Sequence, residues 1–413
     1  MSRTCFFSSN STFKCARFAG RNTASLALRS YSRAYSMQTR PSSPPKAIVY
    51  TKNGPPQDVL KCRSIPSLSL PSRPPPGTLN VRFLLSPINP ADLNVVEGVY
   101  PSKPTLLESS QSGLDEAIYI GGNEGLAQVL EKGEGVEGIE EGDWVVMVKS
   151  QAGTWIGWKN VAVDDVVRVP KTKQGEGGLT EAQAATMTVN PPTAYGMLTD
   201  FVKLKKGDWV VQNGANSAVG QAVIQIASHL GFNTINFVRS RSEDSLNTLK
   251  SYLHSLGATH VYTYDDLSDR SLNLRGKVKE WTGGKGPLLG LNCVGGKETS
   301  LMASLLGQNA HLVSYGAMSK QPLSLPTSLH IFKNLTSHGY WQTRWYETHS
   351  REDREKMMNM LVGLMENGKL KAAEHEIVSL AGFEDNIGQK VASVIKKLNE
   401  GGVGKKMLLK FEH

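Results

Sequence analysis

Residues 207–241 read GDWVVQNGANSAVGQAVIQIASHLGFNTINFVRSR, and this stretch decides the fold. The run 209–211 is short and apolar and leads into a Gly/Asn/Ser turn, which indicates a buried strand. Apolar residues then recur with the spacing of one helix face as far as Gly231, which ends the helix. A second apolar run, 234–238, completes a strand–turn–helix–strand unit. A connection of this length predicts that the two strands are parallel.

The turn of this unit, NGANSAVG, has the composition of a pyrophosphate-binding turn. Small residues let backbone amides approach the phosphates, and the positive end of the following helix stabilises their charge. The residues predicted to make these contacts are Asn216, Ser217, Ala218 and Val219. Dinucleotide-binding turns commonly carry the pattern G-x-G-x-x-G. This glycine fingerprint is degenerate here, because Ala215 and Ser217 occupy its first two glycine positions and only Gly220 remains. The turn alone is therefore equally compatible with a plain tight turn.

The end of the second strand carries Arg239, Ser240 and Arg241. An acidic residue at this place would bind the ribose of NAD. Two guanidinium groups instead suit a ribose 2′-phosphate, so we predict NADPH as the cofactor. The alternative is that the two arginines are a solvated surface pair.

The first 45 residues carry seven basic residues, many serines and no acidic residue. This composition is typical of a mitochondrial transit peptide. Arg33 lies two places before a bond that resembles a matrix-protease cleavage site, so the mature chain is expected to begin near Ser36. We therefore predict that residues 1–45 are an unstructured presequence and that the protein lies in the mitochondrial matrix.

The charge of the remaining chain is close to neutral. Of the 46 Lys and Arg residues seven lie in the presequence, and the other 39 nearly balance the 37 acidic residues. This balance gives little support to a nucleic-acid or membrane-surface partner. Only Cys62 and Cys293 lie outside the presequence, which favours a reducing compartment. No apolar run is long enough to span a bilayer.

Residues 46–168 consist of short β-prone runs separated by turns, which predicts a compact β-rich domain. Within it lie INPADLN (88–94), GVYP (98–101) and GGNEG (121–125). The GGNEG loop and the following GD-containing tail resemble the GroES-like catalytic domain of the medium-chain dehydrogenase/reductase superfamily, and the βαβ unit resembles its Rossmann cofactor domain.

This resemblance implies an α/β protein with a GroES-like β-rich domain and a doubly wound parallel sheet. The expected divisions are a first part of the catalytic domain, a cofactor domain and a C-terminal return to the catalytic domain, at 46–189, 190–345 and 346–413.

The sequence departs from the zinc-dependent members of this superfamily. Asn89 stands where they have a cysteine ligand, and Asn123 stands where they have a histidine. The four-cysteine structural-zinc lobe is absent, and two cysteines cannot rebuild either site. We expect no metal.

Within the zinc-free branch, the motifs above together with NPPTAY (190–195) and NSAVGQAVIQIA resemble the mitochondrial trans-2-enoyl thioester reductases, especially fungal ones. The resemblance implies that Tyr100, on a Gly–Val–Tyr–Pro turn, donates a proton. Further cofactor contacts that it implies are those of Asn190, Tyr315, Gly316, Ala317, Met318, Tyr340, Trp341, Gln342 and Lys406. It also suggests a homodimer.

Each of these residues has a structural alternative. Tyr100 could be a packed tyrosine, and Lys406 a solvated lysine beside the last strand. Tyr340 and Trp341, with Trp345 and Tyr346, are equally compatible with domain-interface or dimer packing.

We therefore predict an NADPH-dependent reductase of enoyl thioesters carried by acyl-carrier protein or coenzyme A, which serves mitochondrial fatty-acid synthesis. The nearest alternative is a quinone or enone reductase of the same branch. An alternative of another class is a non-catalytic member that binds RNA or a protein partner. This alternative predicts basic clusters outside the presequence, and the near-neutral charge of the remaining chain counts against it.

Overall fold

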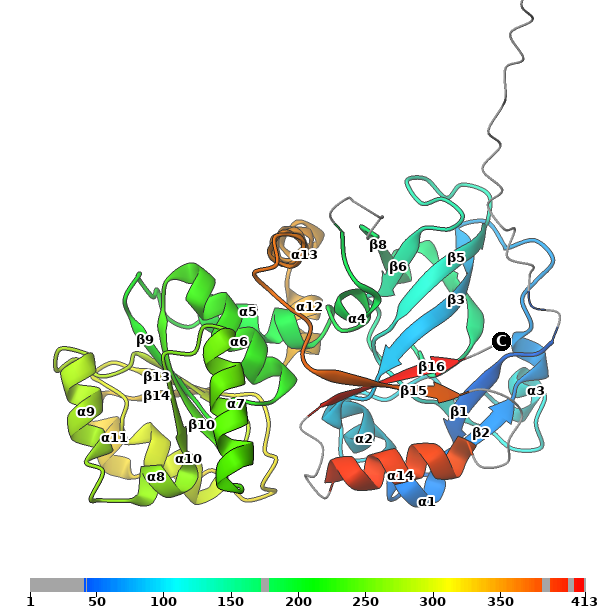
Figure 1. Cartoon of the computed structure of the whole chain (residues 1–413). Helices are drawn as coiled ribbons and strands as arrows, with labels where there is room; N and C mark the ends of the chain where they lie inside the picture. Colours follow the sequence, from blue (N-terminus) through cyan, green and yellow to red (C-terminus); the bar gives the residue numbers. More distant parts are fainter. Residues whose placement is uncertain (1–40, 42, 172–177, 381–386, 400–404, 412–413) are drawn as a thin grey trace, which may run out of the picture. The chain divides into compact units, whose positions relative to one another are not determined.

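The computed structural model describes residues 41, 43–171, 178–380, 387–399 and 405–411 (Figure 1). The predicted presequence up to residue 40, with its cleavage site near Ser36, lies outside the described residues. In the described part of the chain no helix is long and apolar enough to cross a membrane.

The first half of the chain forms most of a mixed sheet. In spatial order it consists of β15 (His375–Leu380), β16 (Lys406–Phe411), β3 (Thr78–Pro87), β5 (Leu126–Lys132), β6 (Trp144–Met147) and β8 (Val166–Val169), with β7 (Trp158–Ala162) paired to β3. A small antiparallel sheet consists of β2 (Lys61–Ser64), β1 (Lys46–Tyr50) and β4 (Tyr119–Ile120). The helices connected to these strands are α1 (Pro56–Val59), α2 (Pro90–Glu97), α3 (Ser109–Ser112), α4 (Glu181–Ala185) and α14 (Ile387–Asn399). The predicted β-rich character of this part of the chain is confirmed.

The second half forms a sheet whose neighbouring strands are all parallel. Its order is β11 (His260–Thr263), β10 (Asn233–Val238), β9 (Trp209–Gln212), β12 (Leu289–Asn292), β13 (His311–Ser314) and β14 (Thr336–Gly339). Its helices are α5 (Asn190–Thr199), α6 (Ala218–Leu230), α7 (Glu243–Ser255), α8 (Tyr264–Ser268), α9 (Leu274–Trp281), α10 (Gly296–Ala303) and α11 (Thr327–Lys333). The predicted strand–turn–helix–strand unit is confirmed as β9, α6 and β10.

Successive residues of β9 show why this sheet is covered on both faces. Val210 packs in the apolar cluster that contains Val223 and Ile226 of α6, whereas Val211 packs in the cluster that contains residues of α9, α10 and α11. Figure 1 shows the strands between these two groups of helices. A run that is apolar at every position is thus buried on both sides, as expected for a parallel strand. The doubly wound arrangement predicted from the sequence is confirmed.

The chain returns to the mixed sheet at its end. Helices α12 (Gln342–Thr348) and α13 (Arg351–Glu366) come first, and Met357, Leu361 and Leu364 of α13 pack in the same cluster as Met197 of α5. Strand β16 then pairs antiparallel with β3, and β15 pairs parallel with β16. This return places Lys406, the first residue of β16, next to residues that precede it by some three hundred positions. The domain boundaries given above stay a prediction.

Candidate active site

The turn between β9 and α6 is built to leave amides free at the start of the helix. Ser217 is the N-cap of α6, and its Oγ accepts a hydrogen bond from the amide of Gly220 (3.1 Å). A Cβ atom on Gly220 would lie 2.6–2.7 Å from backbone atoms of Ala215, so this position requires glycine. The first amides of a helix have no partner within it, and they carry the positive end of its dipole. One glycine of the fingerprint therefore suffices to bring this end close to the strand.

Arg239, Ser240 and Arg241 follow β10 directly and are exposed. Ser240 Oγ donates a hydrogen bond to Asp265 at the start of α8. Burial, and then the charge of Arg239, lower the pKa of Arg241. The structure thus places two neighbouring cations at the carboxyl end of the second strand.

An interlocked amide network, which the sequence analysis did not identify, joins the carboxyl ends of β9 and β12. Asn292 Oδ1 accepts hydrogen bonds from Asn213 Nδ2 (2.9 Å), from Thr299 Oγ1 (2.7 Å) and from the amides of Val294 and Gly295 (both 3.0 Å). Asn213 and Asn292 are both buried. Their side-chain hydrogen bonds therefore hold the turn after β9 and the turn after β12 together. Two asparagines at the ends of apolar strands are the signal that could have indicated it.

The segment of predicted cofactor contacts from Tyr315 to Met318 begins where β13 ends. Tyr315 is half-buried, Gly316, Ala317 and Met318 are exposed, and the amide of Met318 donates to the carbonyl of Cys293 (2.8 Å). This loop is therefore held against the end of β12, on the same edge of the sheet as the α6 N-terminus.

The aromatic residues that precede α12 and lie within it differ in their contacts. Tyr340 packs against Gly196, and its hydroxyl donates to Gln342 Oε1 (2.8 Å). Trp345 Nε1 donates to Asp200 (2.9 Å), and Tyr346 Oη donates to the carbonyl of Thr188 (2.8 Å). Tyr340, Trp345 and Tyr346 thus make packing or anchoring contacts within the chain.

Trp341 makes a different contact, with Tyr100. Helix α2 ends at Gly98, which has a φ of 83° and has no room for a Cβ beside Asn53, and the chain turns there toward Tyr100. Trp341 Nε1 donates a hydrogen bond to Tyr100 Oη (2.7 Å), and the two rings lie edge to face with centroids 5.9 Å apart. Because an indole N–H can only donate, the Tyr100 oxygen is the acceptor, and its own hydroxyl hydrogen is directed to another group.

Burial, the strongest effect, raises the pKa of Tyr100, and the charge of Asp92 raises it further. The hydrogen bonds from Trp341 and Thr343 act in the opposite direction and lower this pKa. The phenol is therefore protonated at neutral pH, with a donor already placed on the oxygen that would carry negative charge after the proton left.

A buried polar cluster lies at the start of α2. Asn89 Nδ2 donates to Glu124 Oε1 (2.7 Å), and Asn89 Oδ1 accepts from Lys406 Nζ and from Asn190 Nδ2 (3.4 Å). The backbone N–H of Asn89 donates to Asp92 Oδ2 (2.7 Å). We name these five residues the Asn89 cluster. Except for the partly buried Lys406, all are buried, and together they join α2, the GGNEG loop, α5 and β16.

Burial sets the ionisation of this cluster. It raises the pKa of Asp92 to about 7 and also raises that of Glu124, while it lowers the pKa of Lys406. The Lys406 charge opposes the shifts of both carboxyls, and their charges in turn favour the ammonium form. In the described part of the chain, no group of three or more His, Cys, Asp and Glu side chains could hold a metal ion. The expectation that the protein binds no metal stays a prediction.

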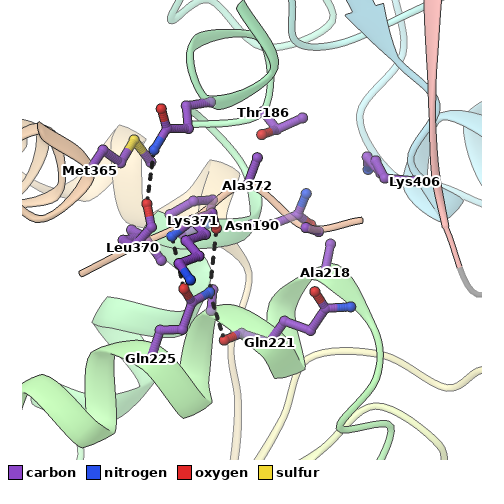
Figure 2. A pocket seen from close by; sticks show the side chains of 14 residues that line it. Thr186, Asn190, Ala218, Gln221, Gln225, Met365, Leu370, Lys371, Ala372 and Lys406 are labelled. Atoms are coloured by element: carbon purple, nitrogen blue, oxygen red, sulfur yellow. Dashed lines mark hydrogen bonds between the residues drawn. The ribbon is translucent and has the colours of Figure 1, made fainter. Parts of the chain in front are cut away.

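A pocket brings three of the predicted cofactor residues together: Asn190, Ala218 and Lys406 (Figure 2). They come from the starts of α5, α6 and β16. Gln221 and Gln225 of α6 line the same pocket, and Gln225 exchanges two hydrogen bonds with the backbone of Lys371 (2.8 and 3.3 Å). Sequence reasoning missed these glutamines, although polar residues on the otherwise apolar face of α6 were a usable signal. Arg239, Ser240 and Arg241 do not line this pocket.

Comparison with known proteins identifies the family. Residues 218–362 match the zinc-binding dehydrogenase family. The mitochondrial enoyl-[acyl-carrier-protein] reductase of Schizosaccharomyces pombe is 41% identical over 371 residues, which cover 89% of this chain and 94% of the relative. The corresponding enzyme of Yarrowia lipolytica is 40% identical over 368 residues, with 89% and 92% covered.

Solved structures agree with the sequence relatives. The complex of Etr1p with NADP and crotonyl-CoA has a TM-score of 0.81 and 37% identity, and the match covers 89% of this chain and 99% of that one. The fold predicted from the sequence, with its GroES-like and Rossmann parts, is thereby confirmed. The chain belongs to the family of mitochondrial enoyl-[acyl-carrier-protein] reductases within the medium-chain dehydrogenase/reductase superfamily.

Proposed function

We propose that this protein reduces trans-2-enoyl thioesters to saturated acyl thioesters with NADPH. The observation that carries the proposal is the contact between Trp341 Nε1 and Tyr100 Oη (2.7 Å), because it leaves the phenol able to donate its proton. Family membership supports the same reaction, since the related Etr1p has been solved with NADP and crotonyl-CoA.

The hydrogen-bond donors and cations of the described residues fit a phosphorylated dinucleotide. The α6 N-terminus suits the pyrophosphate, and the two exposed cations Arg239 and Arg241 suit the 2′-phosphate. Asn190 and Lys406, which share a pocket with Ala218, would hold the part of the cofactor that lies next to the pyrophosphate. The residues proposed to flank the nicotinamide are Tyr315, Gly316, Ala317, Met318, Tyr340, Trp341 and Gln342. The chemistry that NADPH supplies when bound is a hydride.

Tyr100 is the proposed source of the second hydrogen. The β-carbon of the substrate receives the hydride with its two electrons, and the α-carbon receives a proton from Tyr100 Oη, so that the C–C double bond becomes single. The Trp341 N–H then stabilises the phenolate. Water returns a proton to Tyr100, so one proton is consumed for each substrate reduced.

The setting of the reaction follows from the relatives. Enzymes named mitochondrial enoyl-[acyl-carrier-protein] reductases are found in fungi and animals. We place this protein in the mitochondrial matrix, with substrates carried by acyl-carrier protein or coenzyme A and a role in fatty-acid synthesis. A homodimer is proposed, since Etr1p pairs with the related Etr2p of Candida tropicalis in a heterodimer.

A direct assay tests the proposal. Purified protein is mixed with NADPH and with crotonyl-CoA, hexenoyl-CoA or a small quinone, and the oxidation of NADPH is followed by absorbance. We expect turnover with the enoyl thioesters, a saturated acyl-CoA as product, and a preference for NADPH over NADH. Oxidation with the quinone alone would refute the proposal in favour of a quinone reductase.

A further inference from the structure

The Asn89 cluster contains two buried carboxyl groups and one cation, and of these three charged groups only the cation lines the pocket. Lys406 lines the pocket beside Ala218, whereas Glu124, Asp92 and Asn89 do not line it (Figure 2). Glu124 is fully buried, and Asn89 and Asp92 are 3% exposed. Two acidic groups are therefore kept out of water at a cost that only a nearby cation and good hydrogen bonds can offset.

The hydrogen bonds of Asn89 have a fixed direction. An ionised Glu124 carboxylate has no hydrogen to donate and can only accept hydrogen bonds. The side-chain nitrogen of Asn89, which is the donor, therefore points to Glu124 Oε1 (2.7 Å). The amide oxygen must then point the other way, where it accepts from Lys406 and Asn190. The orientation of Asn89, and with it the position of the Lys406 ammonium, follows from the charge on Glu124.

The second carboxylate oxygen of Glu124 is also engaged. Thr188 Oγ1 donates to Glu124 Oε2 (3.2 Å), so the carboxylate is held from two sides. Asp92, in the first turn of α2, accepts a hydrogen bond from the backbone N–H of Asn89. Neither acidic side chain is free to swing toward the pocket.

We propose that Glu124, which acts through the Asn89 side chain, and Asp92, which acts through its charge, are positioning residues for cofactor binding that hold the Lys406 ammonium charged and in place at the pocket wall. This inference rests on the proposed function, because it takes NADPH as the occupant of the pocket. Neither acidic residue touches the cofactor. Their charges keep the partly buried Lys406 protonated at a pH where burial alone would favour the neutral amine.

The alternative is a purely structural cluster that ties β16 to α2. Such a cluster would change the stability of the protein when it is altered, but it would not give the cofactor affinity a pH dependence that belongs to Lys406. The charged and titratable groups that face this cluster are Tyr100, on the side of Asp92, and Tyr346, on the side of Glu124. Burial raises the pKa of both phenols, so neither one becomes charged in the neutral range.

The test measures NADPH affinity by fluorescence from pH 6 to pH 10, without substrate. Asp92, whose pKa burial raises to about 7, is ionised above neutral pH. In the wild type we therefore expect constant affinity just above neutral pH and a decline on the alkaline side as Lys406 loses its proton. In Glu124→Gln the decline should begin about one pH unit lower, because the charge that favours the ammonium is gone. Below this range Lys406 is charged in both proteins, so a weaker affinity of Glu124→Gln there reports displacement of the ammonium through Asn89.

Two further variants make the result independent of whether Glu124→Gln folds. Lys406→Arg keeps a charge at every pH of the series and should remove the alkaline decline. Lys406→Met should weaken NADPH about ten- to a hundredfold at neutral pH, with no alkaline decline. Lys405→Met is the matched control, because Lys405 is the exposed neighbour, and it should behave as the wild type.

Identical pH profiles for the wild type and folded Glu124→Gln would overturn the inference, and so would an alkaline decline that persists in Lys406→Arg. Far-ultraviolet circular dichroism establishes which variants are folded. Failure of the proposed function is seen separately, as wild-type protein that binds NADPH but reduces no enoyl thioester.

Discussion

Replacing Trp341 by phenylalanine isolates the hydrogen bond on which the proposed proton transfer depends. The substitution removes the N–H that lies 2.7 Å from Tyr100 Oη and keeps an aromatic ring for the edge-to-face contact. The pKa of Tyr100 should rise, because the hydrogen bond from Trp341 lowers it in the native protein. The phenol remains protonated at neutral pH, so the ground state is little changed.

The expected loss is the difference between two hydrogen bonds. A bond from an N–H to a neutral oxygen contributes about 1 kcal/mol net, whereas a bond to a charged oxygen contributes about 1.5–3 kcal/mol. The Trp341 bond changes from the first kind to the second as the proton leaves Tyr100. Its removal should therefore raise the barrier by about 0.5–2 kcal/mol, which lowers kcat about two- to thirtyfold.

The assay is steady-state reduction of crotonyl-CoA at saturating NADPH, with NADPH affinity measured separately. Trp345→Phe is the matched control: it also removes an indole N–H, but one that donates to the exposed Asp200, and kcat should stay within about twofold. In a Tyr100→Phe background, Trp341→Phe should cause almost no further loss, because no phenolate forms there. An unchanged kcat for Trp341→Phe, or the same loss in both backgrounds, would show that the bond does not stabilise the phenolate.

Four further predictions concern separate parts of the chain. Tyr100→Phe should lower kcat about a hundredfold or more with NADPH affinity unchanged, and turnover within about threefold of the wild type would mean that another group supplies the proton. Arg241→Ala should weaken NADPH about ten- to a hundredfold and spare NADH, whereas equal losses with both cofactors would remove Arg241 from the 2′-phosphate site. Elemental analysis of active protein should find far less than one zinc ion per chain, and a chelator should leave the rate unchanged. A reporter fused to residues 1–45 should enter mitochondria, and a purely cytosolic signal would contradict the assignment.

Local sequence was sufficient for the cofactor half of the molecule. The strand, turn, helix and strand of residues 207–241 were predictable because each depends on neighbours in the chain: apolar runs, helical spacing and the glycine after Leu230. The carboxyl end of β10 follows directly from the strand, so the position of Arg239 and Arg241 was predictable as well. The roles of Tyr100, Trp341 and Lys406 came only from a family resemblance.

Long-range contacts were decided by the tertiary structure alone. Trp341 and Tyr100 are 241 positions apart, and Lys406 and Asn89 are 317 positions apart, so no local pattern indicates that either pair meets. The direction of the Asn89 amide depends on Glu124, and the charge of Glu124 depends on burial that only the packed mixed sheet provides. Residue type and periodicity thus determined the secondary structure and the class of ligand, because those depend on local backbone preference. Ionisation and donor–acceptor geometry required the fold, because they depend on which distant groups exclude water from one another.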